Sequence, residues 1–596
     1  MSIGPCIMHN DTIKRRPSDS QSTVAPTPTV TISEYWSQSP PDVLCQEISQ
    51  RLARPGAKEE VVKAISRERL EFKNLWNCSL PINQLPYELL VHVFTFILCK
   101  TVTMTDWEIP WFDMRLWRLM GVCRHWRDVV ITTPALWCTV DLDKHTNWIN
   151  LCLSRSLTTP IDIHARVPDL RYRTGLRIAY PLLHRIRSLD FDLYGPVDDR
   201  EGGMLATLRL LFSDRIPALE KLRFNIDPQL RDIYYTPTDI ELTSRRLPCL
   251  QRLIFIGMVA PRDTSLYTQL RTLSLTASPH NLSFNHFLDV LGSCTRLEDL
   301  HLESTLHRLS GDWMQGDPSP RRPLISHPRL ERFIISGHGA VCTSRFLAHF
   351  HIHSSVCLKI SADIGDNEVG TPDPGPDGAR SVAAMLPPSH AVDLEPLAAG
   401  NGIVMCMFAP HGRISINATR SPPHAAWMVG TAFLSIGGQS GPSRGSVSDL
   451  IEVFGRCPVT SLSVNQIRPD AVALWTNVFC TFPLLERLDV SGYCEDDCGP
   501  AIENVFLGLH AASTADSASS LVACPNLRHV RAQGVGTTAV YEAIRTCVRY
   551  RGDKGVVLVE LELDLFDGSD VCSAMRRACI KDSLHGTMGL KVYDGE

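Results

Sequence analysis

The segment LPCLQRLIFIG at residues 247–257 decides the fold of most of this chain. Its last apolar residues, Leu253 and Phe255, occupy alternate positions, which is the period of a strand with one buried face. Leu250 stands three residues before Leu253 and anchors the turn that leads in. One copy of this pattern therefore predicts a tight turn followed by a short strand.

The same pattern recurs through the C-terminal part of the chain. Seven further copies with a similar lead-in are IPALEKLRFNI (216–226), YTQLRTLSLTA (267–277), CTRLEDLHLES (294–304), HPRLERFIISG (327–337), CPVTSLSVNQ (457–466), FPLLERLDVSG (482–492) and CPNLRHVRAQG (524–534). Two divergent members are IRSLDFDLY (186–194) and LVELELDLF (558–566). The anchoring leucines Leu250 and Leu270 are 20 residues apart, whereas Leu297 and Leu330 are 33 apart, so the repeat is irregular.

Helical stretches lie between the copies, for example at 284–291 and 448–454. A strand followed by a helix, repeated so that each unit covers the apolar face of its neighbour, is typical of a leucine-rich-repeat solenoid. An ordinary α/β domain with leucine-bearing parallel strands is the alternative, and the number of similar lead-ins favours repeats. The predicted fold class is α/β, with an irregular leucine-rich-repeat domain over residues 141–596.

Parts of this domain depart from the pattern. Residues 362–392 are rich in turn formers and 511–520 in small residues, and both segments predict solvated loop insertions. The wider region 360–440 contains no copy of the repeat, so we expect it to disturb the arc of the solenoid.

In a solenoid, the residues that alternate with the buried ones face one concave surface. The candidate target-binding residues on that surface are Lys221, Arg223, Asp299, His301, Arg487, Asp489, His529 and Arg531. Both signs of charge are present, which favours a protein partner over a polyanion. The alternative for any one of these residues is an ordinary solvated position.

Residues 82–137 form a separate apolar unit ahead of the repeats. From Leu89 to Ile97 apolar residues recur at three- and four-residue steps, which predicts an amphipathic helix. A second helix is predicted between Leu116 and Val130, ended by Pro134. The pattern alone predicts a plain helical hairpin.

Three short motifs in this unit resemble those of a known family. LPYELL (85–90), VCRHWRDVV (122–130) and PALW (134–137) follow one another as in the F-box family, and the chain is similar in style to the expanded F-box families of mushroom-forming fungi. The resemblance implies a small helical F-box domain at 79–140 that docks on the Skp adaptor of an SCF-type cullin–RING ubiquitin ligase. It also implies that the chain is the substrate-recognition subunit, whose repeats bind a target protein.

The resemblance further implies which residues bind the adaptor. They are Leu85, Pro86, Leu89, Leu90, Val93, Phe94, Val122, Cys123 and Trp126. A unit of about 55 residues is too small to bury all its apolar side chains, so we expect about half of these to face the adaptor. The link at 98–116 is longer than is usual in the family and supports the alternative of a non-ligase interaction scaffold.

The composition of the 596-residue chain bounds its partners and location. A net charge of −5 gives no reason to expect nucleic acid or a membrane surface as a partner. Twenty cysteines without framework spacing are typical of reduced thiols, so we expect a cytoplasmic or nuclear protein. Residues 1–40 predict a disordered segment, and residues 41–78 an amphipathic helical segment.

Few residues suggest catalysis or metal chemistry. His349, His351 and His353 alternate, and on a strand they could offer three imidazoles to zinc, but no further ligand pattern accompanies them. Ser443 lies in a G-x-S-x-G match inside a Gly/Ser-rich stretch, not directly between a strand and a helix. We therefore expect no catalytic residue, metal or cofactor, and no enzyme activity.

Overall fold

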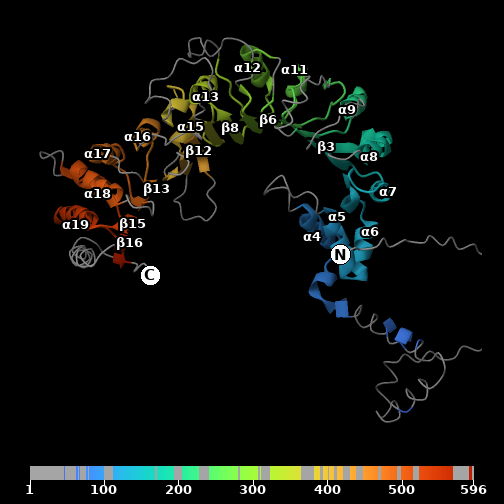
Figure 1. Cartoon of the computed structure of the whole chain (residues 1–596), viewed down its shortest axis with the longest axis horizontal. Coiled ribbons are helices and arrows are strands. Elements are labelled where there is room, and N and C mark those ends of the chain that lie inside the picture. Colours follow the sequence, from blue (N-terminus) through green and yellow to red (C-terminus); the bar gives the residue numbers. More distant parts are fainter. Residues whose placement is uncertain are drawn as a thin grey trace, which may run out of the picture. The chain divides into compact units, whose positions relative to one another are not determined.

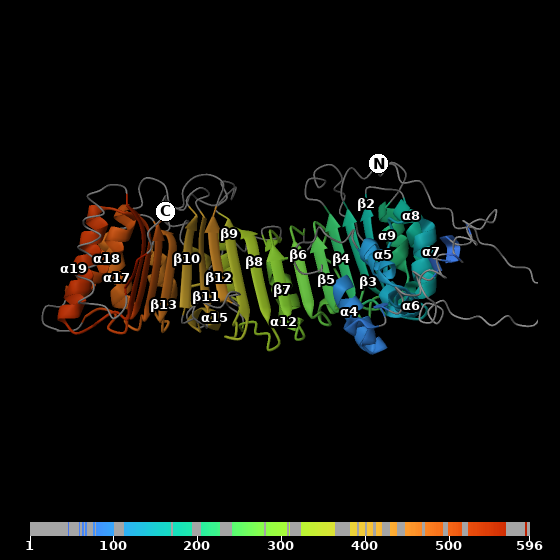
Figure 2. The ribbon, with the colours of Figure 1, turned by 90° about the horizontal axis from the view of Figure 1, so that it is seen from below.

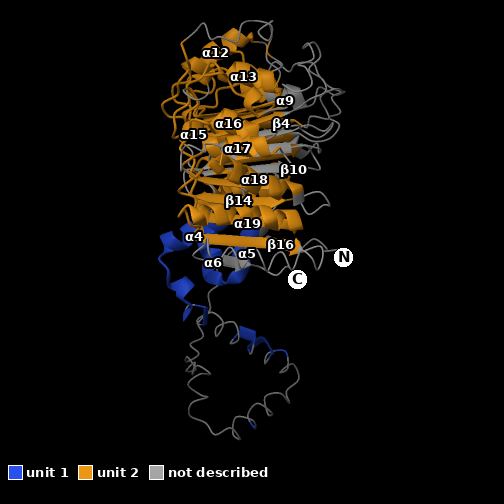
Figure 3. Cartoon of the chain, turned by 90° about the vertical axis from the view of Figure 1, so that its left-hand side faces the viewer, with its two compact units in different colours: residues 1–130 blue, residues 131–596 orange. Residues whose placement is uncertain are grey.

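The computed structural model describes most of the predicted elements. The described residues are 46, 59, 62–64, 66–67, 76–77, 79–99, 112–167, 171–193, 204–226, 241–278, 282–306, 309, 323–363, 382–389, 393–399, 402–408, 413–419, 430–437, 447–467, 471–492, 499–514, 522–567 and 590–592. The chain divides into two compact units, residues 1–130 and 131–596 (Figure 3). The segment 1–40, most of 41–78, the central part of the 98–116 link and Ser443 lie outside the described residues.

The first unit is helical where it is described. Its elements are η1 (Pro81–Gln84), α4 (Tyr87–Cys99), α5 (Phe112–Val122) and α6 (Arg124–Thr132), the last of which crosses the division at residue 130. The single helix predicted between Leu116 and Val130 is therefore wrong: it is broken at Cys123. The Cys123 sulfur accepts the backbone N–H of Trp126 at 3.5 Å and so takes the place of a capping side chain at the start of α6.

The second unit is built on one sheet of seventeen described strands (Figure 2). The first nine are β1 (Thr139–Asp141), β2 (Ile161–Val167), β3 (Ile186–Leu193), β4 (Lys221–Ile226), β5 (Arg252–Ile256), β6 (Thr272–Thr276), β7 (Asp299–Glu303), β8 (Arg332–His338) and β9 (Cys357–Asp363). The others are β10 (Gly402–Phe408), β11 (Arg413–Thr419), β12 (Gly430–Gly437), β13 (Ser461–Ile467), β14 (Arg487–Gly492), β15 (His529–Gly536), β16 (Glu560–Asp567) and β17 (Leu590–Val592).

The strands lie side by side in chain order over two long stretches. Each neighbouring pair from β1 to β9 is parallel, and so is each pair from β13 to β17. Each of the ten segments predicted to hold a strand contains one. The predicted class, a helical region followed by an α/β body, is confirmed, and its long parallel sheet is consistent with a repeat solenoid.

The region 360–440 does not interrupt the sheet, contrary to expectation. β12 pairs in parallel with β9, and β10 pairs in parallel with β13. β11 lies between β12 and β10 and is antiparallel to both. The insertion therefore satisfies its backbone hydrogen bonds within the sheet by adding two antiparallel pairings, and the stacking of strands continues through it.

Figure 1 shows the longer helices of the second unit on the outer, convex face of its curved sheet, and among the described residues no helical layer covers the inner face. The helical elements of this unit are η3 (Pro134–Trp137), α7 (Thr146–Arg155), α8 (Arg171–Ala179), η4 (Tyr180–Arg185), α9 (Met204–Ser213), α11 (Thr264–Tyr267), α12 (Phe284–Ser293), α13 (Ala340–Leu347), η8 (Ala383–Met385), α15 (Glu395–Ala398), α16 (Ser448–Phe454), α17 (Val472–Thr481), α18 (Gly499–Thr514) and α19 (Thr538–Asp553). Among the described residues, none of the helices is long and apolar enough to cross a bilayer.

The repeated pattern of the sequence has a repeated structural cause. At each anchoring leucine the backbone N–H donates to a carbonyl three residues earlier, for example from Leu250 to Leu247 at 3.3 Å and from Leu270 to Tyr267 at 3.1 Å. The strand that follows adds one side chain to an apolar row across the sheet. That row is Leu189, Leu222, Leu253, Leu273, Leu300, Phe333 and Leu358, each fully buried. Burying each of these side chains contributes roughly 1.5–3 kcal/mol.

Two of the predicted loops contain regular structure. Residues 511–514 belong to α18, where Ser513 is buried and its carbonyl accepts a hydrogen bond from the Tyr550 hydroxyl at 3.2 Å. Within 362–392, η8 forms at Ala383–Met385 and buries Val382 and Met385. The remainder of both segments, 515–520 and most of 364–392, lies outside the described residues.

Candidate functional site

α4 carries apolar side chains on two faces. Leu90, Phe94 and Leu98 recur at four-residue steps and are buried in the helical unit. Of the predicted adaptor-binding residues, Leu90 and Phe94 therefore belong to the core of this unit. The later helices of the unit contribute further buried side chains, which are Leu116, Leu119, Met120, Val129 and Val130.

The second face of α4 is exposed. Leu89, Val93 and Phe96 lie at steps of four and three residues, with Ile97 beside them, and so share one side of the helix. The side chain of Leu89 is 52% exposed and that of Phe96 58%, while Val93 is half-buried. A helix of a globular protein usually has one apolar stripe, so this exposed stripe needs another explanation.

The other predicted adaptor-binding residues are also accessible. Val122, at the end of α5, is 56% exposed, and Pro86 is exposed ahead of α4. Leu85, Cys123 and Trp126 are half-buried. Seven of the nine predicted residues thus reach the surface of the helical unit, and two do not.

Trp126 joins the start of the unit to its end. Its indole Nε1–H donates to the Asn83 side-chain oxygen at 2.5 Å, and its ring centroid lies 4.7 Å from that of Phe94. Asn83 in turn donates from Nδ2 to the Asn77 carbonyl at 2.7 Å. These contacts hold η1 beside α6 and fix the position of the LPYELL segment between them.

The sequence analysis missed several exposed apolar residues. Among the described residues, nine of the sixteen large apolar side chains that are exposed lie in the first unit, although the second unit is much the larger. Those not predicted as contacts are Val62, Trp76, Ile82, Tyr87, Phe96, Ile97 and Trp117. Ile97 was visible as part of the apolar period, but the period alone does not say which face of α4 is covered.

The eight predicted target-binding residues lie on the helix-free face of the sheet. In each strand they alternate with buried residues, as Lys221 and Arg223 do with Leu222 and Phe224. The parallel register places Thr272 next to Asp299, Ser274 next to His301, Arg487 next to His529, and Asp489 next to Arg531. The predicted alternation is therefore correct. Four of the eight residues lie on β4 and β7, and the other four lie on β14 and β15, in a separate part of the face.

Arg223 is an exception to the exposure expected on this face. Only 5% of the residue is accessible, and its Nη1 lies 3.4 Å from Asp190 Oδ1 and 3.8 Å from Asp192 Oδ1. Burial raises the pKa of the Asp190 carboxyl, but the nearby His164, whose Nδ1 lies 3.5 Å from Asp190 Oδ2, with the charges of Arg223 and Lys221, outweighs this and holds the pKa below its usual value. Burial raises the pKa of Asp192. This part of the face is a packed ion cluster.

Other charged residues of the face are also paired, within one strand for Arg487 with Asp489 and across neighbouring strands elsewhere. Arg332 binds Asp299 with two hydrogen bonds, of 2.6 and 3.0 Å. Arg531 Nε lies 3.4 Å from Glu562 Oε1, and His529 Nδ1 lies 3.3 Å from Glu560 Oε2. The acidic partners on β16 were not among the predicted residues, because only the strand register brings them into contact. The face presents paired charges of both signs.

Residues 82–143 match the F-box-like family model. The matched segment contains all nine predicted adaptor-binding residues and covers about a tenth of the chain. A search of curated proteins found no similar protein. The chain thus has an F-box-like region followed by a long parallel-sheet body, F-box proteins are typically non-catalytic adaptors, and an F-box implies a Skp-type adaptor as partner.

Proposed function

We propose that this chain is the substrate-recognition subunit of an SCF-type cullin–RING ubiquitin ligase. In this proposal the F-box-like region binds a Skp-type adaptor, and the sheet body binds a target protein. The chain contributes proximity between the target and the ligase core and does no bond chemistry itself. The body would be a leucine-rich-repeat domain, as its strand-and-turn pattern suggests.

The exposed stripe on α4 is the observation that carries the proposal. Leu89, Val93 and Phe96 form an apolar face on a helix whose opposite face already fills the core of its own unit. A partner helix laid against such a face buries it in the helix-in-groove mode. Each Leu or Phe side chain removed from water would contribute roughly 1.5–3 kcal/mol to binding. The proposed adaptor contacts are therefore Leu85, Pro86, Leu89, Val93, Val122, Cys123 and Trp126, with Phe96 and Ile97 added.

A pair of variants on α4 tests the adaptor contact. Leu89→Asp combined with Phe96→Asp puts two charges into the exposed stripe, and we expect the purified full-length variant to bind a Skp-type adaptor at least about a hundredfold more weakly. Thr95→Asp adds a charge to another side of the same helix and is expected to bind like the wild type, since Thr95 is exposed and lies outside the stripe. Leu90 is left unchanged, because its burial means that a charge there would unfold the unit.

The outcome separates the proposal from its alternative. If the stripe variant binds the adaptor as well as the wild type does, the assignment of the docking face is wrong. If the folded wild-type chain does not bind the adaptor at all, the chain acts as a non-ligase interaction scaffold. Either conclusion requires that every variant is folded, so the helical content measured by circular dichroism must match that of the wild type.

A further inference from the structure

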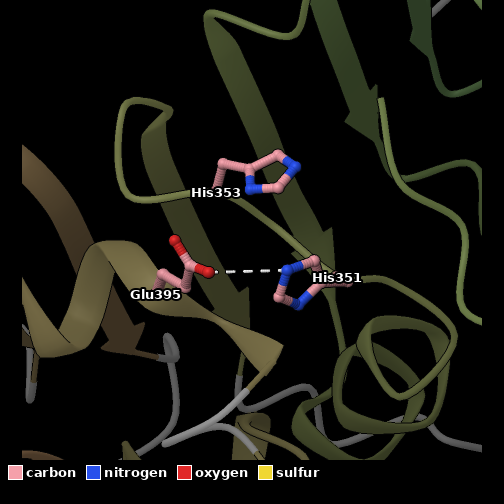
Figure 4. A group of neighbouring side chains, drawn as sticks. All are labelled: His351, His353 and Glu395. Carbon is pink, nitrogen blue, oxygen red and sulfur yellow. Dashed lines mark ion pairs between the residues drawn. The ribbon is translucent and has the colours of Figure 1, made fainter. Parts of the chain in front are cut away.

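Two histidines and one glutamate meet near the point where the parallel sheet gives way to the inserted antiparallel strands (Figure 4). His351 and His353 precede β9, and Glu395 is the first residue of α15, which precedes β10. Each residue offers one ligand atom, an imidazole nitrogen or a carboxylate oxygen, and these three atoms all lie within 4.8 Å of one another. The group is independent of the adaptor-docking face.

The backbone around the group is fixed by hydrogen bonds between three segments. The N–H of His351 donates to the Ile325 carbonyl at 2.9 Å. The N–H of Ile352 donates to the Asp393 carbonyl at 2.7 Å, and the N–H of Glu395 donates back to the Ile352 carbonyl at 3.0 Å. The reciprocal bonds between Ile352 and residues 393–395 hold α15 beside the histidine segment. The fold therefore brings together the two segments that carry the three side chains.

Neighbouring polar groups orient two of the three side chains, those of Glu395 and His353. The backbone N–H of Ser354 donates to Glu395 Oε2 at 2.9 Å, which leaves Oε1 directed at His351 Nε2, 3.5 Å away. Ser326 Oγ lies 3.2 Å from His353 Nε2. Metal ligands in proteins are commonly held in place by such outer hydrogen bonds.

One separation between ligand atoms already fits a small divalent ion. Zinc binds imidazole nitrogen and carboxylate oxygen at about 2.0–2.2 Å in tetrahedral geometry, so its ligand atoms lie about 3.4 Å apart. His351 and Glu395 already have this separation. The imidazole rings of His351 and His353 are 5.0 Å apart between centroids, and one ligand atom of each of the three residues lies within 4.8 Å of the other two, so small side-chain adjustments would close the site around an ion.

We propose that His351, His353 and Glu395 bind a divalent transition-metal ion of the zinc class. Two imidazoles and one carboxylate suit zinc, and three protein ligands leave one coordination position for water or for a side chain of a bound partner. The ion would tie the segment before β9 to α15, and so would brace the start of the β10–β12 insertion. His349 takes no part, because its ring packs against Phe284 at 5.5 Å between centroids.

Zinc titration of the metal-stripped full-length protein tests this site. We expect isothermal titration calorimetry to show one more zinc bound by the wild type than by His351→Ala, and at least tenfold weaker binding at this site in Glu395→Gln and His353→Gln. The His286→Ala variant is the matched control, because His286 is an exposed histidine on α12 that is not one of the three clustered residues. All proteins keep the 20 cysteines, so zinc held by thiols cancels in the comparison.

A second measurement guards against loss of fold. Zinc should raise the unfolding temperature of the wild type and of His286→Ala by more than that of His353→Gln, whose exposed side chain can be changed with little disturbance. Equal zinc stoichiometry, affinity and thermal shift in the wild type and in all three site variants would overturn the proposal. Loss of adaptor binding in the α4 variants has no bearing on this result.

Discussion

At the scale of single residues, the helical unit depends on contacts that tie its first residues to its last. Trp126 donates to Asn83 and packs on Phe94, so one side chain links η1, α4 and α6. The half-buried indole leaves part of its ring for a partner. The same residue is thus predicted to serve both the stability of the unit and the adaptor contact.

Replacing Trp126 with Phe tests the structural part of this role. The ring contact with Phe94 can remain, but the hydrogen bond to Asn83 is lost, and we expect local stability to fall by about 1 kcal/mol. Hydrogen–deuterium exchange of the amides in α4 should then be several-fold faster. Trp76→Phe, at a 61% exposed tryptophan of the same unit, should leave that exchange unchanged. Unchanged exchange in Trp126→Phe would show that the bond contributes little.

Arg223 shows the opposite situation, a charge that is held inside the sheet face. Removing it with Arg223→Met would leave the carboxylates of Asp190 and Asp192 buried with less positive charge beside them, and we expect a loss of about 3–5 kcal/mol at neutral pH. The matched control is Arg252→Met, an exposed neighbour in the next strand. The control should change the unfolding temperature little.

The loss in Arg223→Met should depend on pH. In the wild type the pKa of Asp190 is below its usual value of 3.8. The ionised carboxylate therefore stabilises the fold at pH values above 3.8, and this stabilisation is lost as the pH falls through the lowered pKa. Without Arg223 the pKa of both carboxyls should rise, because burial then outweighs the remaining positive charge. Lowering the pH from 7 to 5 should therefore narrow the gap in unfolding temperature between variant and wild type. A gap that widens would contradict this account.

At the scale of elements, close packing of helices sets the stacking of the C-terminal repeats. α17 and α18 approach at Gly508, where an added Cβ would lie 2.4 Å from the Trp475 Cβ and 3.1 Å from the Thr476 backbone nitrogen. Trp475 is fully buried, so neither neighbour can move without disturbing the core. Glycine at this position is required by the distance between two helices and not by a turn.

Gly508→Ala should therefore destabilise the protein, although alanine is the better helix former. We expect a loss of about 1–3 kcal/mol, seen as a lower urea midpoint for the second unit. Gly292→Ala in α12 is the matched control, since its added Cβ would meet only the Ile325 side chain at 3.9 Å. That control should be neutral or more stable by up to about 1 kcal/mol. The proposal about packing is wrong if both variants shift in the same direction.

At the scale of the whole molecule, the proposed adaptor-binding surface and the proposed target-binding surface belong to different units. The exposed apolar stripe belongs to the first unit, and the helix-free face with its paired charges belongs to the second. An apolar face suits a constant partner, and a surface of mixed charge suits selection among proteins. The two activities should therefore be separable by substitution.

Affinity capture followed by identification of the bound proteins measures this separation. The Leu89→Asp, Phe96→Asp variant should lose the Skp-type adaptor and cullin core but retain the proteins that bind the sheet face. Arg531→Glu, at an exposed residue of β15, should keep the adaptor and weaken target binding. If the stripe variant loses all its partners while remaining folded, the two activities are not separate.

The sequence by itself determined ten of the seventeen described strands, the lead-in turns of most of them and the helical F-box-like region. Those features follow from local spacing: a leucine three residues before the first buried leucine of the strand, alternation within the strand, and three- and four-residue steps in the helix. The sequence did not determine which side of α4 is free, because Leu89 and Leu90 are equally apolar neighbours.

Only the tertiary structure decided that Leu90 faces inward and Leu89 outward, since the packing of α5 and α6 covers one side of α4. It also decided that Glu395 lies beside His351, 44 positions earlier, and that β11 and β12 fill the gap between β9 and β10. Spacing along the chain describes neighbours within one element. Contacts between distant segments depend on which surfaces pack together, and local periodicity does not contain that information.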